Sequence, residues 1–180
     1  FDTPLLVCSS LYRRIFAPQK HADIAEALVK FVAQRANRLL DWSLSEERQK
    51  RLILGLSKHV ASFPAAKRWY AHLFRETGAR LLIREEGCYG GSSLINRIAR
   101  DCNVITAEYQ HGAISSGHDA YNFAEVLRSN EEYKKTLPQY FLGYGQWWMD
   151  QVGIPSIKIA IGNPNHTESI AKVFPSNQEK

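Results

Sequence analysis

The chain has 180 residues, of which 44% are hydrophobic, 23% charged and 11% aromatic, and its formal net charge is +5. This composition is ordinary for a single globular domain and argues against intrinsic disorder and fibrous repeats. No apolar run approaches the roughly 20 residues of a transmembrane helix, and the first residues lack the basic start of a signal peptide.

The first part of the chain is predicted to be mainly helical. An apolar run at 4–11 predicts a buried strand, and a helical spacing of apolar residues then predicts a helix over 21–42. Ser43 or Ser45 is a suitable cap for the next helix. Pro64 is typical of the start of a third helix, which Gly78 ends. Together these elements form a helical block at about 20–77.

Strands and helices alternate more tightly after this block. A strand is predicted at 79–87, a helix at 92–102 and a second strand at 103–112. This strand–helix–strand unit predicts a parallel sheet with right-handed crossovers. The remaining predicted elements are a loop and helix over 118–137, a strand at 138–145, a short helix at 146–153 and a strand at 156–165. The predicted fold class is therefore α/β, a Rossmann-like parallel sheet flanked by helices.

The charge is distributed unevenly along the chain. Residues 1–80 carry a net charge of +7 and residues 81–180 a net charge of −2. The basic part fits an anionic substrate or a membrane surface, or is simply a solvated helical face. No nucleic-acid-binding signature accompanies it, so no nucleic-acid partner is expected. The three cysteines form no CxxC pair, which favours a reducing compartment and a cytoplasmic location.

Polar and glycine-rich clusters follow the predicted strands, where ligands bind in open parallel sheets. His111 directly follows a strand and precedes Gly112, which leaves room for a close ligand. A histidine at this place is suited to act as the general base for a hydroxyl group, and the alternative is a buried histidine bonded to a carbonyl. Gln110 precedes it and is expected to shape the same pocket.

Two other segments offer groups that can act beside His111. His118, Asp119 and Tyr121 follow on a loop that can orient His111 or touch a substrate, although Asp119 is also a suitable helix cap. Glu86 ends the preceding strand, where a carboxylate can act as a base or bind sugar hydroxyls, or merely cap the next helix.

The turn between that strand and the following helix is rich in glycine. Tyr89, Gly90 and Gly91 precede the helix and offer backbone N–H groups to an anion, or form only a tight turn. The six histidines are scattered, with no HxH or HExxH motif, so neither a metal nor another cofactor is expected.

A hydrolase is one alternative. Cys88, Asp119 and His166 follow the order of nucleophile, acid and histidine that α/β hydrolases use. The nucleophile elbow needs glycine two residues before and after the nucleophile, but Glu86 occupies the first of these positions. A non-catalytic carbohydrate- or partner-binding domain is the other alternative.

Residues 85–123 and 137–164 resemble the N-terminal domain of GT-B glycosyltransferases that build bacterial capsule or O-antigen polysaccharides. Three features carry the resemblance in order: a strand ending in Gln-His-Gly, a loop with His-x-x-Tyr, and a strand ending in Gly-Asn-Pro. The resemblance implies that His111 is a catalytic residue on the acceptor side of a cleft between two Rossmann-like domains. It also places Asn163 at the passage to the second domain.

The resemblance implies a domain organisation and a set of partners. Residues 1–164 are expected to form the N-terminal, acceptor-side domain, and residues 165–180 a linker toward a C-terminal domain that holds a nucleotide-sugar donor. The acceptor is expected to be a saccharide or glycolipid, with peripheral contact at the inner membrane. The isolated chain is expected to be inactive. On this hypothesis, the candidate catalytic residues are His111, Glu86 and Asp119. The candidate substrate-binding residues are Gln110, Gly112, His118, Tyr121, Tyr89, Gly90, Gly91 and Asn163.

Overall fold

The computed structural model describes residues 22–40, 43–163 and 166. The strand predicted at 4–11 and most of the linker predicted at 165–180 lie outside the described residues. The chain divides into two compact units, Phe1–Trp69 and Tyr70–Lys180. This division falls inside the helical block that the sequence analysis joins to the sheet in one domain, so each unit is described by itself.

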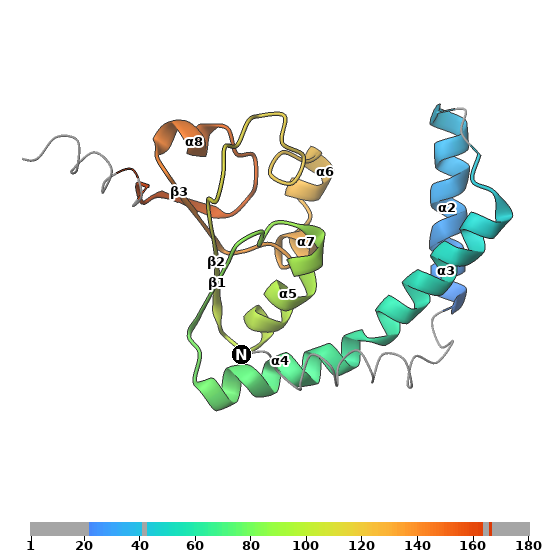
Figure 1. Cartoon of the computed structure of the whole chain (residues 1–180), viewed down its shortest axis with the longest axis horizontal. Coiled ribbons are helices and arrows are strands. Elements are labelled where there is room, and N and C mark those ends of the chain that lie inside the picture. Colours follow the sequence, from blue (N-terminus) through green and yellow to red (C-terminus); the bar gives the residue numbers. More distant parts are fainter. Residues whose placement is uncertain (1–21, 41–42, 164–165, 167–180) are drawn as a thin grey trace, which may run out of the picture. The chain divides into compact units, whose positions relative to one another are not determined.

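The first unit contains a helical hairpin formed by α2 (Ala22–Leu40) and α3 (Glu46–Ala61), and α4 (Phe63–Thr77) follows it in the chain (Figure 1). The prediction of these three helices is confirmed. Ser45 caps α3 as expected, because its hydroxyl oxygen accepts a hydrogen bond from the Arg48 N–H. Gly78 ends α4 with a φ of 59°, a conformation that glycine adopts without steric cost.

The second unit is built on a parallel sheet of four strands: β1 (Leu81–Arg84), β2 (Ile105–Tyr109), β3 (Tyr140–Gly143) and β4 (Ile157–Ala160). The strands lie in the order β1-β2-β3-β4, and each pair of neighbours is parallel. The predicted α/β, Rossmann-like fold class is confirmed. Glu86, predicted to end the first strand, instead lies in the turn that follows it, because β1 ends at Arg84.

The connections between the strands are helical. A 3-10 turn, η2 (Gly90–Ser92), leads into α5 (Ser93–Asp101) between β1 and β2. Two short helices, α6 (Glu125–Arg128) and α7 (Glu131–Lys134), precede β3, and α8 (Gln146–Asp150) precedes β4. The order of the strands in the sheet follows their order in the chain without a reversal. Right-handed crossovers therefore place all of these helices on the same face of the sheet. Figure 1 shows α5 and α7 on one side of β1 and β2.

The register shows how the two faces of the sheet differ. Leu82 pairs with Thr106 and faces the helices, where it packs against a buried cluster of Phe74, Ile98, Ala99 and Val104. Side chains at alternating positions point to the opposite face. Six of these side chains are 39% to 58% exposed: Leu81, Ile83, Ile105, Tyr109, Ile157 and Ile159. Ala107, at the centre of the same face, is buried.

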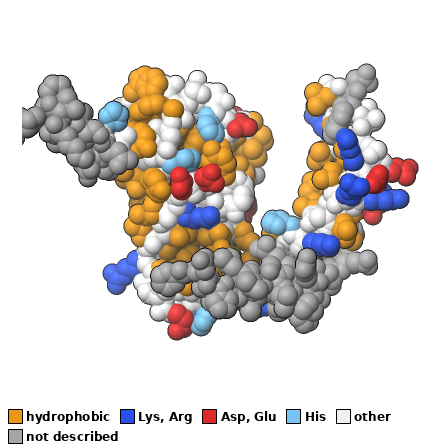
Figure 2. Space-filling model, in the orientation of Figure 1, with side chains coloured by type: hydrophobic (Ala, Val, Ile, Leu, Met, Phe, Trp, Pro, Cys, Tyr) orange, Lys and Arg blue, Asp and Glu red, His pale blue; other side chains and the backbone are white. Residues whose placement is uncertain are grey.

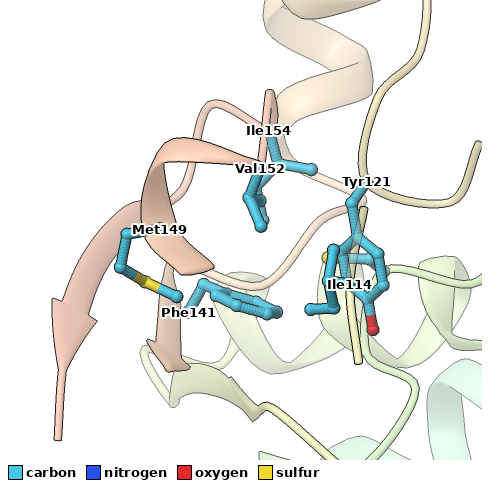
Figure 3. Packing of buried hydrophobic residues seen from close by; sticks show 7 residues of the cluster. Ile114, Tyr121, Phe141, Met149, Val152 and Ile154 are labelled. Carbon is cyan, nitrogen blue, oxygen red and sulfur yellow. The ribbon is translucent and has the colours of Figure 1, made fainter. Parts of the chain in front are cut away.

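A second buried cluster lies under the loops that follow the strands. Phe141 of β3 is fully buried and its ring centroid lies 5.3 Å from that of Tyr121. Figure 3 shows Met149 on one side of Phe141 and Ile114 and Tyr121 on the other. The loop after β2 is thus anchored in the hydrophobic core by Ile114 and Tyr121, although most of its other residues are exposed.

Candidate functional site

The polar side chains that follow the strands gather at one edge of the sheet, because the carboxyl ends of parallel strands lie together. Figure 2 shows histidine, aspartate and glutamate side chains close to one another over the end of β2. The described strands do not reverse their order, so no topological switch point lies between them. The case for a site at this edge therefore depends on the side chains themselves.

Glu108 of β2 is the centre of a buried hydrogen-bond network at this edge. Its side chain is 0% exposed, and its Oε1 accepts a hydrogen bond of 2.6 Å from the Tyr121 hydroxyl. Its Oε2 accepts one of 2.7 Å from the backbone N–H of Cys88. Gly87 allows this approach, since a Cβ there would lie 3.1 Å from the Glu108 Cβ. The carboxyl group thus joins the turn after β1 to the loop after β2.

Glu108 is not among the functional residues predicted from the sequence. The available signal was the alternation along β2, in which Thr106, Glu108 and Gln110 are polar residues at every second position. These three side chains share one face of the strand, and all three are buried. A run of polar residues on a buried face indicates an internal hydrogen-bond network rather than contact with solvent.

Gln110, which precedes His111, ties the segment after β2 to the segment after β3. It is 1% exposed, and its Nε2 donates a hydrogen bond of 2.8 Å to the carbonyl of Gly112. Its Oε1 accepts a bond of 2.9 Å from the backbone N–H of Tyr144, beyond the end of β3. The predicted role of Gln110 in shaping the pocket is therefore structural, because its amide has partners inside the protein. His111 itself is exposed, immediately beyond the strand.

Tyr89 and His118 meet across the turn and the loop. The Tyr89 hydroxyl lies 3.2 Å from His118 Nε2, and the His118 ring lies edge-on to Tyr121 with 4.8 Å between centroids. His118 Nδ1 lies 3.9 Å from an oxygen of Asp119 and makes no hydrogen bond. Burial raises the pKa of Tyr89, and the negative charges of Glu86, Glu108 and Asp119 raise it further. Tyr89 thus shares one electrostatic environment with the predicted Glu86 and Asp119 and with the buried Glu108.

Asn122 holds the loop that carries His118. Its Nδ2 donates to the carbonyls of Ser115, His118 and Gln151, and its Oδ1 accepts a bond of 2.8 Å from the N–H of Gly153. The loop is therefore tied to the segment after α8 as well as to the core. A loop held in this way can present His118 and its neighbours in a fixed arrangement.

The candidate residues differ in their access to a ligand. Tyr121 is only 1% exposed, so its hydroxyl is not accessible to a ligand. It donates a hydrogen bond to Glu108 and thereby helps to hold the loop in place. Asn163 lies beyond the end of β4 and is partly buried, with its carbonyl accepting a bond from His166. The exposed candidates at this edge are His111, Glu86, Asp119, Gly90, Gly91 and Gly112.

Cys88, the nucleophile of the alternative hydrolase, is buried under this network. Burial raises the pKa of its thiol, and the neighbouring Glu108 raises it further. Since the thiolate is the reactive form, a raised pKa and lack of access both oppose nucleophilic attack. The environment of Cys88 is that of a structural thiol.

Alkylation of the folded chain tests this description of Cys88. At pH 8, iodoacetamide should modify Cys88 at least about tenfold more slowly than the partly buried Cys102. In the urea-unfolded chain, the two thiols should react at similar rates. Peptide mass spectrometry measures each site separately. Rapid modification of Cys88 in the folded chain would contradict a buried thiol with a raised pKa.

Among the residues that the structure describes, no group of three or more His, Cys, Asp or Glu side chains is arranged to hold a metal ion. None of the helices in the described ranges combines the length and apolar character needed to cross a bilayer.

Comparison of the chain with known protein families, curated proteins and solved structures finds no match.

Proposed function

We propose that this chain provides the acceptor-binding side of a glycosyltransferase, which transfers a sugar from a nucleotide-activated donor to a growing bacterial surface polysaccharide or glycolipid. The observation that carries the proposal is the placement of His111, exposed just beyond the carboxyl end of β2. It follows the buried Gln110, whose side chain ties Gly112 to Tyr144 beyond the end of β3. A side chain placed in this way is accessible to a substrate, and the backbone next to it is held by hydrogen bonds.

The chemistry of sugar transfer suits a histidine at this position. The acceptor hydroxyl must lose a proton as it attacks the anomeric carbon of the donor, and an imidazole is a suitable base near neutral pH. In the proposed reaction His111 takes this proton, a bond forms between the acceptor oxygen and the anomeric carbon, and the nucleotide leaves with the electrons of the broken bond. Exposed carboxylates such as Glu86 and Asp119 are suited to bind other hydroxyls of the acceptor.

The resemblance of the motifs to GT-B enzymes supports the same assignment. In this proposal the donor nucleotide is bound by a second Rossmann-like domain, and the acceptor lies against the sheet edge described above. The proposal places the reaction in the cytoplasm, at the inner face of the membrane. The buried thiol of Cys88 gives no comparable support to the hydrolase alternative.

A transfer assay tests the proposed activity. The product of the native gene would be incubated with radiolabelled UDP-, GDP-, dTDP- and CMP-sugars and with glycolipids extracted from the source bacterium. The proposal predicts that label from at least one donor enters the glycolipid or polysaccharide fraction. Release of label to water alone, or esterase activity that iodoacetamide abolishes, would contradict it. Saturable glycolipid binding without transfer from any donor would instead support the non-catalytic binding domain.

A further inference from the structure

Helix α2 has an unusual distribution of large and small apolar side chains. Ala25 and Val29, which lie one turn apart, are 1% and 8% exposed. Five large apolar residues lie on a neighbouring side of the helix and are 49% to 65% exposed. We call them the apolar stripe of α2, and they comprise Ile24, Leu28, Phe31, Val32 and Leu39. Exposed large apolar residues in a continuous row indicate an interaction surface.

The apolar stripe continues onto α3. Leu28 and Val32 line a groove of about 540 Å³ together with Leu52, Gly55 and Leu56 of α3. Leu52 is 51% exposed, and a Cβ placed on Gly55 would meet nothing within 4 Å. Figure 2 shows hydrophobic side chains along this hairpin, with Lys and Arg side chains beside them. The surface is therefore wider than one helix and open along its length.

Arginines lie within and beside the apolar surface. Arg35 is one helical turn from both Phe31 and Leu39 and thus lies in the stripe. Arg38 is two turns from Phe31, Arg48 is one turn from Leu52, and Arg51 lines the groove.

The acidic residues of α2 lie elsewhere on the helix. Asp23 and Glu26 fall on a polar side with Lys30, and Glu26 forms an ion pair with Lys30. In the first turn of α3, Glu47 forms an ion pair with Arg51. The apolar side of α2 is therefore cationic, whereas its acids face away from the stripe.

We infer that the apolar stripe and its arginines dock on an anionic lipid bilayer, with α2 lying in the plane of the interface. Helices that bind in this way combine a row of Leu, Ile and Phe with Lys or Arg along its borders. Arg35 distinguishes a bilayer from a protein partner. Beside a bilayer, its long side chain can reach the lipid phosphates while Phe31 and Leu39 enter the apolar region. In a protein interface, it would need a matching acid within an apolar contact.

The proposed function places the chain at a membrane, and this inference assigns the surface that docks there from observations that do not involve sugar transfer. Binding to vesicles requires neither a donor nor an acceptor sugar, so failure of one proposal leaves the other intact. If both hold, docking by the hairpin brings the chain to the surface where a lipid-linked acceptor resides.

Co-sedimentation of the full 180-residue chain with vesicles tests the inference. Vesicles made of equal parts of phosphatidylcholine and phosphatidylglycerol should bind the chain about tenfold more tightly than vesicles of phosphatidylcholine alone. The double variant Leu28→Gln/Phe31→Gln should weaken binding to the anionic vesicles by about tenfold or more. Since both side chains are exposed, circular dichroism should show unchanged helix content.

Matched variants on the other unit serve as controls. Val126→Gln/Trp147→Gln removes two apolar side chains that are 72% and 63% exposed and should leave vesicle binding unchanged. Arg35→Gln/Arg38→Gln should weaken binding to anionic vesicles only, whereas Lys134→Gln/Lys135→Gln should not.

Two outcomes would overturn the inference. Equal binding to neutral and anionic vesicles, or no binding to either, would remove the lipid surface as the partner. Conversion of a dimer to a monomer by Leu28→Gln/Phe31→Gln, without loss of vesicle binding, would assign the stripe to a second copy of the chain.

Discussion

Replacing Glu108 with alanine should lower the free energy of unfolding by about 3 to 5 kcal/mol. The substitution leaves the Tyr121 hydroxyl and the Cys88 N–H, both buried, without their acceptor. It also creates a cavity beside Gly87, which is packed against this side chain. Urea denaturation followed by circular dichroism measures the loss.

Variants that remove fewer atoms than Glu108→Ala separate the contributions of individual hydrogen bonds to the free energy of unfolding. Tyr121→Phe removes only one hydroxyl, so it should lower the free energy of unfolding by about 1 to 2 kcal/mol. Glu108→Gln keeps the shape of the side chain and should fall between this variant and Glu108→Ala. Glu125→Ala on the exposed surface of α6 is the matched control, with an effect below about 0.5 kcal/mol. A Glu108→Ala effect within 1 kcal/mol of this control would contradict a stabilising role for the buried carboxyl.

Local patterns in the sequence were sufficient to predict most of the fold. Ser45 and Gly78 mark helix boundaries because capping and left-handed backbone are local properties of a few residues. The parallel sheet followed from the strand–helix–strand unit, since parallel neighbours require a crossover.

The burial of α2 shows what periodicity alone does not determine. A helical spacing predicts the helix, but two apolar rows are present, one of small residues and one of large residues. The row containing Ala25 and Val29 is buried, whereas Leu28 and Phe31 are exposed. Which row is buried depends on the shape of the neighbouring helix, which the sequence of α2 does not contain.

The candidate site was predicted in part. The sequence predicted Glu86 at the end of one strand and His111 and His118 after the next, and the structure brings the turn and the loop that carry them to the same edge of the sheet. It did not predict Glu108, because the partners of this carboxyl, Tyr121 and Cys88, lie 13 and 20 residues away. Such a network depends on tertiary contacts between two loops.

The exposed His111 is the residue on which the proposed chemistry depends most strongly. His111→Ala should lower kcat for sugar transfer by about 100-fold to 10,000-fold, the usual contribution of a general base. The KM for the acceptor should change much less, because the other polar side chains at this edge of the sheet remain in place. Since the side chain is exposed, the variant should unfold at the same urea concentration as the unsubstituted chain.

The most direct test compares His111→Ala with His72→Ala in the protein that the native gene encodes. His72 is another exposed histidine, located on α4 beside Glu76, and the proposed reaction does not use it. Initial rates of transfer from the active nucleotide sugar would be measured at saturating acceptor. The account predicts a loss of about 100-fold or more in His111→Ala and an unchanged rate in His72→Ala. Transfer by His111→Ala within threefold of the His72→Ala rate would contradict the assignment of His111 as the catalytic base.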